Sequence, residues 1–211
     1  MELMNQISTA LQAGKAKDVK ALVQQAIDEG NTASSILNEG LVAGMNVIGA
    51  KFKNNEIYVP DVLIAARAMK AGTELLKPLL KEAGVKASGK VVIGTVAGDL
   101  HDIGKNLVAM MMEGKGMEII DLGCDVPAER FVQAAIDNDA QIIACSALLT
   151  TTMGEMKSVV ELAREKGIRE KVTIMVGGAP VNESYCHQIG ADIYSADAAT
   201  AAEAALAKLL A

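Results

Sequence analysis

The stretch that decides the fold is an apolar segment followed by a polar loop, Lys90-Val91-Val92-Ile93-Gly94-Thr95-Val96-Ala97-Gly98-Asp99-Leu100-His101-Asp102-Ile103-Gly104-Lys105-Asn106. The apolar part predicts a buried strand, and a helical pattern follows the loop. Open α/β sheets bind ligands at the carboxyl ends of their strands. His101 is one of only two histidines in the chain. Because a carboxylate can orient a histidine and improve it as a metal ligand, Asp99 and His101 mark the predicted functional site.

The alternation of strand, loop and helix continues to the end of the chain. The predicted strands are residues 91–96, 118–122, 141–146, 172–176 and 192–194. Helical patterns separate and follow them, at residues 105–113, 128–138, 152–166, 183–189 and 198–210. This alternation predicts a flavodoxin-like (Rossmann-like) α/β fold with a doubly wound parallel sheet of five strands.

The first part of the chain has a different rhythm. Up to residue 84 the apolar residues keep helical spacing and group into four helices with short connections. This predicts a four-helix bundle as an N-terminal cap domain over residues 1–84. The segment 85–89 is the predicted linker, and residues 90–211 form the predicted α/β domain.

The composition narrows the class of protein. The chain of 211 residues is 51% hydrophobic but only 2% aromatic, so aliphatic and methionine side chains must build its core. A net charge of -6 disfavours nucleic acid as a partner. No apolar run approaches the roughly 20 residues that cross a bilayer, so we expect no membrane association. Three separated cysteines, Cys124, Cys145 and Cys186, predict reduced thiols in a cytoplasmic protein.

The pattern Asp99-x-His101-x-x-Gly104 allows two interpretations. Taken alone it favours a helix N-cap, in which Asp99 or Asp102 accepts backbone N–H bonds. Its place after the first strand favours a ligand loop instead. Gly98 and Gly104 would let a large flat ligand approach the backbone.

Further motifs follow in order along the chain. They are Asp121-Leu122-Gly123-Cys124-Asp125-Val126-Pro127, Ser146-Ala147-Leu148-Leu149-Thr150-Thr151-Thr152-Met153 and Gly177-Gly178-Ala179-Pro180. The helical half contributes Gly44-Met45-Asn46-Val47-Ile48-Gly49, then Phe52 and Tyr58-Val59-Pro60. With the histidine motif, this series resembles the cobalamin-binding region of methionine synthase and the stand-alone corrinoid proteins that serve methyltransferases.

The resemblance implies a role for each matching residue. His101 would be the lower axial ligand of cobalt in a base-off corrinoid, Asp99 would accept the other ring N–H, and Thr152 would stand where methionine synthase has a serine in this relay. The other implied cofactor contacts are Gly98, Leu100, Asp102, Ile103, Gly104, Ser146, Leu148, Thr150, Gly177, Gly178 and Ala198. Plainer interpretations stay open, because Ser146 and Thr150 also suit turns or caps and Gly177-Gly178 suits a tight turn.

The resemblance also assigns the helical half a role as a cover for the upper corrin face. The implied residues are Met45, Phe52, Val59 and Val62. Ordinary bundle core is the alternative, and for Met45 it is the preferred one. Phe52 lies in the polar stretch Lys51-Phe52-Lys53-Asn54-Asn55, where a core residue is not expected.

The function implied by the resemblance is that of a methyl carrier without catalytic activity of its own. Cobalt(I) would accept a methyl group from a donor on a substrate-specific methyltransferase. Methylcobalt(III) would pass it, through a second methyltransferase, to a folate- or pterin-type carrier or to coenzyme M. A reductive activase would be a further partner, in a one-carbon pathway such as methanogenesis or acetogenesis.

Two other functions remain open at this point. One is a cobalamin-binding sensor or regulatory module, and the other is a flavodoxin-like or receiver-type domain without a corrinoid. The donor also stays open among methylamines, methanol, methoxyaromatics and betaines.

Overall fold

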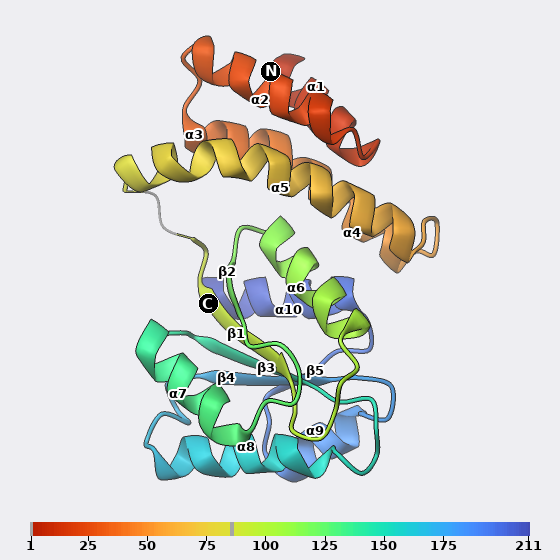
Figure 1. Cartoon of the computed structure of the whole chain (residues 1–211), viewed down its shortest axis with the longest axis vertical. Helices are drawn as coiled ribbons and strands as arrows, with labels where there is room; N and C mark the ends of the chain where they lie inside the picture. The colour runs from red at the N-terminus through yellow and green to blue at the C-terminus, as the bar shows by residue number, and fades with distance from the viewer. Residues whose placement is uncertain (1, 85–86) are drawn as a thin grey trace. The chain divides into compact units, whose positions relative to one another are not determined.

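The chain consists of two compact units, and the computed structural model describes residues 2–84 and 87–211 (Figure 1). A helical unit comes first, and an α/β unit begins at Ser88. Val85 and Lys86, in the predicted linker, lie outside the described residues.

Helices build the first unit, as predicted. They are α1 (Glu2–Gln12), α2 (Ala16–Asp28), a continuous helix formed by α3 (Ala33–Ser35), the π-helical segment η1 (Ile36–Val42) and α4 (Ala43–Lys53), and finally α5 (Val59–Glu82). Two glycines in the continuous helix face α1 closely. A Cβ at Gly40 would lie 3.0 Å from Ile7 Cγ2, and one at Gly44 would lie 3.0 Å from the carbonyl oxygen of Ser8. The absence of side chains there lets the two helices pack.

Phe52 has a different environment from the one its polar neighbours suggest. Helix α4 continues through Lys53 and places Phe52, half-buried, in its last turn. Lys51 and Lys53 suit this turn because cations stabilise the carboxyl end of a helix. The helix stops at Asn54, and Asn55 takes a left-handed conformation with φ 58°.

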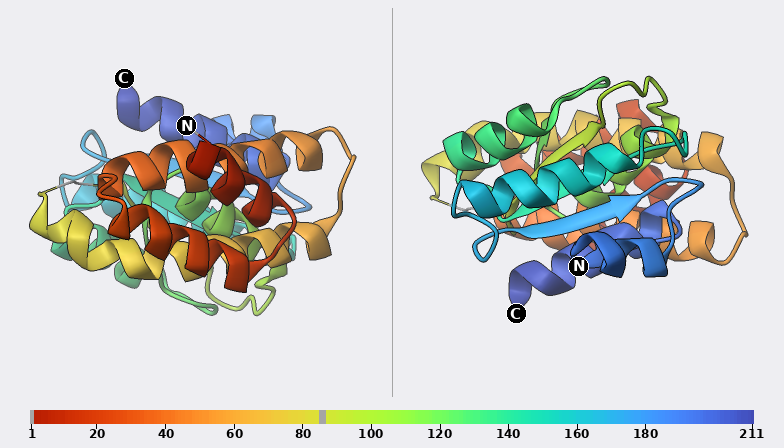
Figure 2. Two further views of the ribbon diagram at one scale, coloured as in Figure 1. Left: turned by 90° about the horizontal axis from the view of Figure 1, so that it is seen from above. Right: turned by 90° about the horizontal axis from the view of Figure 1, so that it is seen from below.

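The α/β unit is a parallel sheet with helices on both faces. Its strands are β1 (Lys90–Thr95), β2 (Glu118–Asp121), β3 (Ile142–Ser146), β4 (Thr173–Gly177) and β5 (Ile193–Tyr194), in the order β2-β1-β3-β4-β5. Its helices are α6 (Ile103–Gly114), α7 (Ala128–Asn138), α8 (Gly154–Glu165), α9 (Glu183–Ile189) and α10 (Ala198–Leu210). α6 and α10 cover one face, and α7, α8 and α9 cover the other (Figures 1 and 2). In the described part of the chain, the predicted doubly wound sheet of five parallel strands is confirmed.

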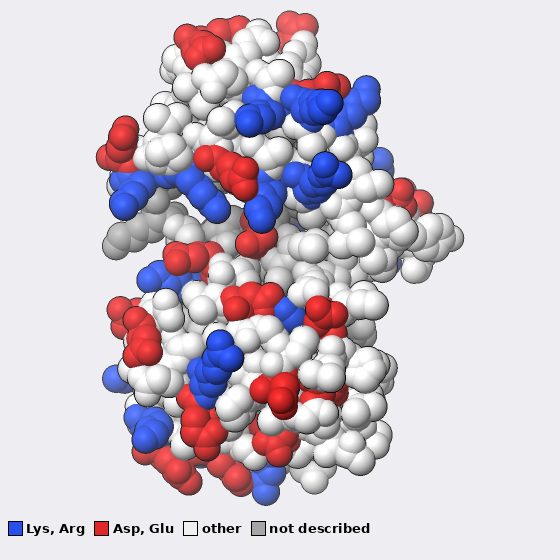
Figure 3. Space-filling model, viewed as in Figure 1, with Lys and Arg blue, Asp and Glu red and all other residues white. Residues whose placement is uncertain are grey.

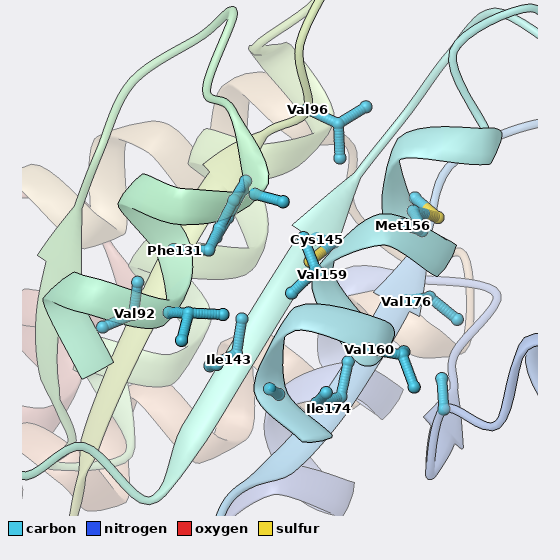
Figure 4. Packing of buried hydrophobic residues seen from close by; sticks show 14 of the residues in the cluster. Val92, Val96, Phe131, Ile143, Cys145, Met156, Val159, Val160, Ile174 and Val176 are labelled. Carbon is cyan, nitrogen blue, oxygen red and sulfur yellow. The ribbon is translucent and has the colours of Figure 1, made fainter. Parts of the chain in front are cut away.

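The core under α7 and α8 fixes the register of the central strands. Val92 pairs with Ile143, and Ile143 pairs with Ile174, so three branched side chains form one row. Phe131 packs against them from α7 and fills the space that a side chain at Gly94 would need (Figure 4). Cys145 lies in this core, where burial raises the pKa of its thiol to about 12. Its thiol therefore stays protonated and serves as packing.

Charge is distributed unevenly over the surface. Lysine and arginine side chains gather on the face of the helical unit formed by α2 and α5 (Figure 3). The exposed cations of these two helices are Lys17, Lys20, Arg67, Lys70, Lys77 and Lys81. Acidic residues outnumber basic ones in the α/β unit, so the net negative charge of the chain comes from there. Among the described residues, no helix is long and apolar enough to cross a membrane.

Replacing Phe131 tests this core. We expect Phe131→Ala to lower the free energy of unfolding of the α/β unit by about 3–5 kcal/mol, because it leaves a cavity beneath β1. Ile136→Ala, on an exposed position of the same helix, should cost less than about 1 kcal/mol. Guanidinium denaturation followed by far-UV circular dichroism measures both. Equal losses in the two variants would contradict the packing described.

Candidate functional site

The candidate site lies where the strand order reverses. β1 and β3 are neighbours, and the helices that follow them, α6 and α8, cover opposite faces of the sheet. The histidine loop, residues 96–102, and the β3–α8 loop, residues 147–153, therefore leave the sheet side by side at its carboxyl edge. Doubly wound folds of this strand order bind ligands at such a point.

Asp99 connects the two loops. Its carboxylate is fully buried. Oδ1 accepts from Nδ1 of His101 at 2.7 Å and from the backbone N–H of His101 at 3.1 Å. Oδ2 accepts from the backbone N–H groups of Leu148 at 2.8 Å and Leu149 at 3.1 Å, and from the hydroxyl of Thr152 at 2.9 Å. Burial by itself raises the pKa of Asp99, but these hydrogen bonds outweigh it and hold the pKa well below its usual range.

The hydrogen bond to Asp99 fixes which nitrogen of His101 is available. An ionised carboxylate can only accept, so Nδ1 carries the proton and Nε2 of the neutral ring keeps its lone pair. The imidazole is 52% exposed, which leaves it accessible to a ligand. A metal held by a macrocycle could take one further ligand from the protein. Nε2 is a donor of that type, supported by a carboxylate behind it.

Large apolar side chains are exposed around this histidine. Leu100 is 74% exposed and Ile103 is 77% exposed, on either side of His101 in the sequence. Leu148 and Leu149, in the loop that Asp99 holds, are 43% and 41% exposed. Exposed apolar side chains at the carboxyl edge of a sheet are typical of a binding site for a large, partly apolar ligand. The residues fit a corrin ring in this respect.

The predicted tail-binding residues follow the carboxyl edge of the sheet. Ser146 pairs with Gly177 across β3 and β4, and Gly177 faces the backbone of Ser195 after β5. Gly178 has φ 125°, and a Cβ there would overlap the carbonyl oxygen of Ala147. The hydroxyl of Ser195 is buried and has no hydrogen-bond partner among the described residues. Such an unpartnered hydroxyl, in the residue that Gly177 faces, fits the polar part of a bound tail.

The remaining predicted residues have mixed environments. Asp102, immediately before α6, accepts a hydrogen bond at 3.0 Å from Asn106 in the first turn of that helix. A Cβ at Gly104 would meet no atom within 4 Å, so this position is open. Thr150 is exposed in the β3–α8 loop, and Ala198 is buried at the start of α10.

The four residues predicted to cover the corrin lie in the helical unit. Met45 and Val62 are buried, whereas Phe52 and Val59 are half-buried. The structure brings Asp99, His101 and Thr152 together in the α/β unit, whereas the four cover residues belong to the other unit. The cover therefore stays a prediction.

Comparison with known proteins identifies the family. A B12 binding domain model matches residues 89–207, and a second B12 binding domain model matches residues 3–77. The dimethylamine corrinoid protein of Methanosarcina barkeri is 44% identical over 212 aligned residues, which cover 100% of this chain and 98% of that protein. The chain belongs to the corrinoid proteins of methyltransferase systems. It is thus a corrinoid-binding protein, as the ordered motifs indicate.

Other corrinoid proteins agree in sequence and in structure. A corrinoid protein of Desulfitobacterium hafniense is 40% identical, with 97% of this chain and 96% of that protein covered. The crystal structure of a methanol:cobalamin methyltransferase complex from Methanosarcina barkeri aligns with a TM-score of 0.89 at 34% identity. That alignment covers 99% of this chain and 80% of the other. The resemblance noted in the sequence thus extends over both units.

Three residues of this corrinoid protein escaped the sequence interpretation. Thr95 is fully buried, and its hydroxyl donates to the carbonyl oxygen of His101 at 3.0 Å. Asp125 accepts from the backbone N–H of Gly98 at 2.7 Å. Ser195 contributes the orphaned hydroxyl described above. Two signals in the sequence pointed to them: Thr95 is a polar residue at the end of an apolar strand, and Asp125 lies in the motif that follows the second strand.

Thr152 offers a direct test of the support for Asp99. Its hydroxyl oxygen lies 2.9 Å from both Asp99 Oδ2 and the carbonyl oxygen of Leu149, and the charged acceptor is the stronger. We expect Thr152→Val to lower the free energy of unfolding of the cofactor-free protein by about 1–3 kcal/mol, because it removes a donor to a buried charge. Thr152→Ser keeps the hydroxyl and should retain most of the stability. Chemical denaturation compares the two, and an equal loss would show that the methyl group matters instead.

Proposed function

We propose that this corrinoid protein is a methyl carrier in which His101 is the lower axial ligand of a base-off corrinoid. The supporting observation is the Asp99–His101 pair, which orients the imidazole and leaves Nε2 available in the described structure. When bound, the corrinoid supplies a cobalt centre that is strongly nucleophilic in its reduced form and can exchange a methyl group. The protein has no catalytic activity of its own in this proposal.

The residues of the chain hold and tune the group. Asp99 and Thr152 fix the imidazole, while Leu100 and Ile103 offer apolar contacts around it. Ser146, Gly177 and Gly178 leave a path for the displaced tail of the cofactor along the carboxyl edge of the sheet. The buried hydroxyl of Ser195, which has no hydrogen-bond partner among the described residues, is proposed to bind this tail. Met45, Phe52, Val59 and Val62 are proposed to shelter the upper face from the helical unit.

The partners follow from the chemistry and from the relatives. We propose that a substrate-specific methyltransferase delivers the methyl group, a second one removes it to a pterin-type or thiol acceptor, and a reductive activase restores the reduced metal. Several relatives are named dimethylamine corrinoid proteins, so methylamines are the donors to test first. We propose that this methyl transfer takes place in the cytoplasm, where the three free thiols would stay reduced.

Axial ligation is testable by spectroscopy. The protein is prepared without cofactor, loaded with hydroxocobalamin and reduced to the cobalt(II) state. The cobalt lines of its electron paramagnetic resonance spectrum should then show coupling to a nitrogen nucleus. Labelling the histidines with ¹⁵N should change each triplet to a doublet, because the coupled nitrogen then has nuclear spin one half. This change separates a histidine ligand from the cofactor's own benzimidazole.

His101→Ala should abolish the coupling from the labelled histidine. His187→Ala is the matched control, because His187 is exposed on α9 and pairs with Glu183. The ligand assignment would be refuted if the doublet persists in His101→Ala. It would also be refuted if the wild-type protein still shows triplets after its histidines are labelled with ¹⁵N.

Methyl transfer separates a carrier from a sensor. The reduced, loaded protein is mixed with dimethylamine and with a methyltransferase specific for dimethylamine, and the visible spectrum is followed. We expect conversion to the methylated cofactor. Monomethylamine, trimethylamine and methanol, each with a methyltransferase specific for it, test the other donors. An unchanged spectrum with every pair would favour the regulatory module.

A further inference from the structure

The motif after β2, Asp121 to Pro127, has no role in the function proposed above. The strand order gives it a defined place. Because β1 lies between β2 and β3, the loops that follow β2 and β3 flank the histidine loop on its two sides. The β3–α8 loop holds one side through the carboxylate of Asp99. The β2–α7 loop, residues 122–127, is in a position to hold the other.

Asp125 makes this second attachment. Its Oδ1 accepts from the backbone N–H of Gly98 at 2.7 Å, and its own backbone N–H donates to the carbonyl oxygen of Asp99 at 3.0 Å. Both bonds reach the histidine loop immediately before His101. Gly98 has φ 76°, so its N–H is presented by a backbone conformation that depends on glycine.

The β2–α7 loop is itself anchored on β1. The N–H of Thr95 donates to the carbonyl oxygen of Gly123 at 2.9 Å, and the N–H of Val126 donates to the carbonyl oxygen of Thr95 at 3.0 Å. The sheet thus continues past the end of β2 and carries Asp125 with it. The buried ammonium of Lys105, on α6, adds an ion pair with Asp121 at 2.6 Å. A rigid base of this kind lets Asp125 constrain a neighbouring loop.

The backbone conformation of Asp125 restricts which residues can occupy this position. Its φ is 53°, in the left-handed region that aspartate and asparagine tolerate better than most residues. The side chain is exposed overall, so burial does not dictate the residue type. What the position uses is a left-handed conformation together with an oxygen that accepts from Gly98.

We propose that Asp125 is a positioning residue for the cobalt-ligand loop. By fixing the backbone of Gly98 and Asp99, it keeps the Asp99 carboxylate and the imidazole of His101 in one geometry and so holds Nε2 in place. Asp99 is then held between two loops, by its side chain on one and its backbone on the other. The inference rests on the proposed role of His101 as axial ligand.

Three variants separate the hydrogen bond from the backbone conformation. Asp125→Gly removes the carboxylate but accepts φ 53° without strain. Asp125→Asn keeps both the conformation and an accepting oxygen. Asp139→Gly is the matched control, because Asp139 is also exposed, has φ 50° and lies at the carboxyl end of α7, away from the carboxyl edge of the sheet.

The measurement is the fraction of cobalt(II) that shows coupling to ¹⁵N-histidine in the full-length protein loaded with hydroxocobalamin. We expect Asp125→Gly to lower the ratio of coordinated to uncoordinated cobalt(II) by about threefold or more, since a charge-assisted hydrogen bond is lost. Asp125→Asn should recover most of the wild-type ratio, and Asp139→Gly should keep it. A ratio in Asp125→Gly equal to that in Asp139→Gly would overturn the inference.

Amide hydrogen exchange in the cofactor-free protein gives a second readout. The N–H of Gly98 should exchange about tenfold faster or more in Asp125→Gly than in Asp139→Gly, while amides of β3 keep their rates. An unchanged exchange rate at Gly98 would show that Asp125 does not fix the histidine loop, and this result does not depend on any cofactor. A different result would separate the two proposals. If the wild-type protein shows no histidine coupling, the proposed axial ligation is wrong. If Gly98 still loses its protection in Asp125→Gly, then Asp125 fixes the loop but has no role in metal ligation.

Discussion

The buried carboxylate of Asp99 is the interaction on which the site depends. A charge without water around it is costly, and here five donors from two loops compensate for that cost. Because one oxygen faces the imidazole and the other faces the β3–α8 loop, the compensation also positions His101. Stability of the fold and presentation of Nε2 therefore have the same physical origin.

The strand order explains why such a carboxylate is available at all. Parallel strands bring the loops that follow them to one edge of the sheet, and β1 lies between β2 and β3. The histidine loop thus lies between the loops that follow β2 and β3. A residue in it can bind in two directions, and Asp99 does so with its side chain and its backbone.

Local sequence patterns were enough to predict the sheet and the pairing of Asp99 with His101. The apolar run of β1 and its polar continuation indicate a buried strand and a functional loop without any knowledge of the rest. Thr95 and Asp125 could not be recognised in this way, because their partners depend on the pairing of β1 with the chain that follows β2. The helical environment of Phe52 was hidden for a related reason, since its basic and amide neighbours look irregular in sequence but form the last turn of a helix.

The arrangement of donors around Asp99 also bears on how a ligand can leave and return. The backbone N–H groups of Leu148 and Leu149 and the hydroxyl of Thr152 bind one oxygen, independently of the imidazole. If the ring releases a metal and rotates, the carboxylate keeps these three donors and stays in place. The loop then needs no reordering when the ring returns, so the entropic cost of restoring the ligand is small. A preformed carboxylate thereby suits a histidine that binds and releases a metal repeatedly, as the proposed carrier function requires.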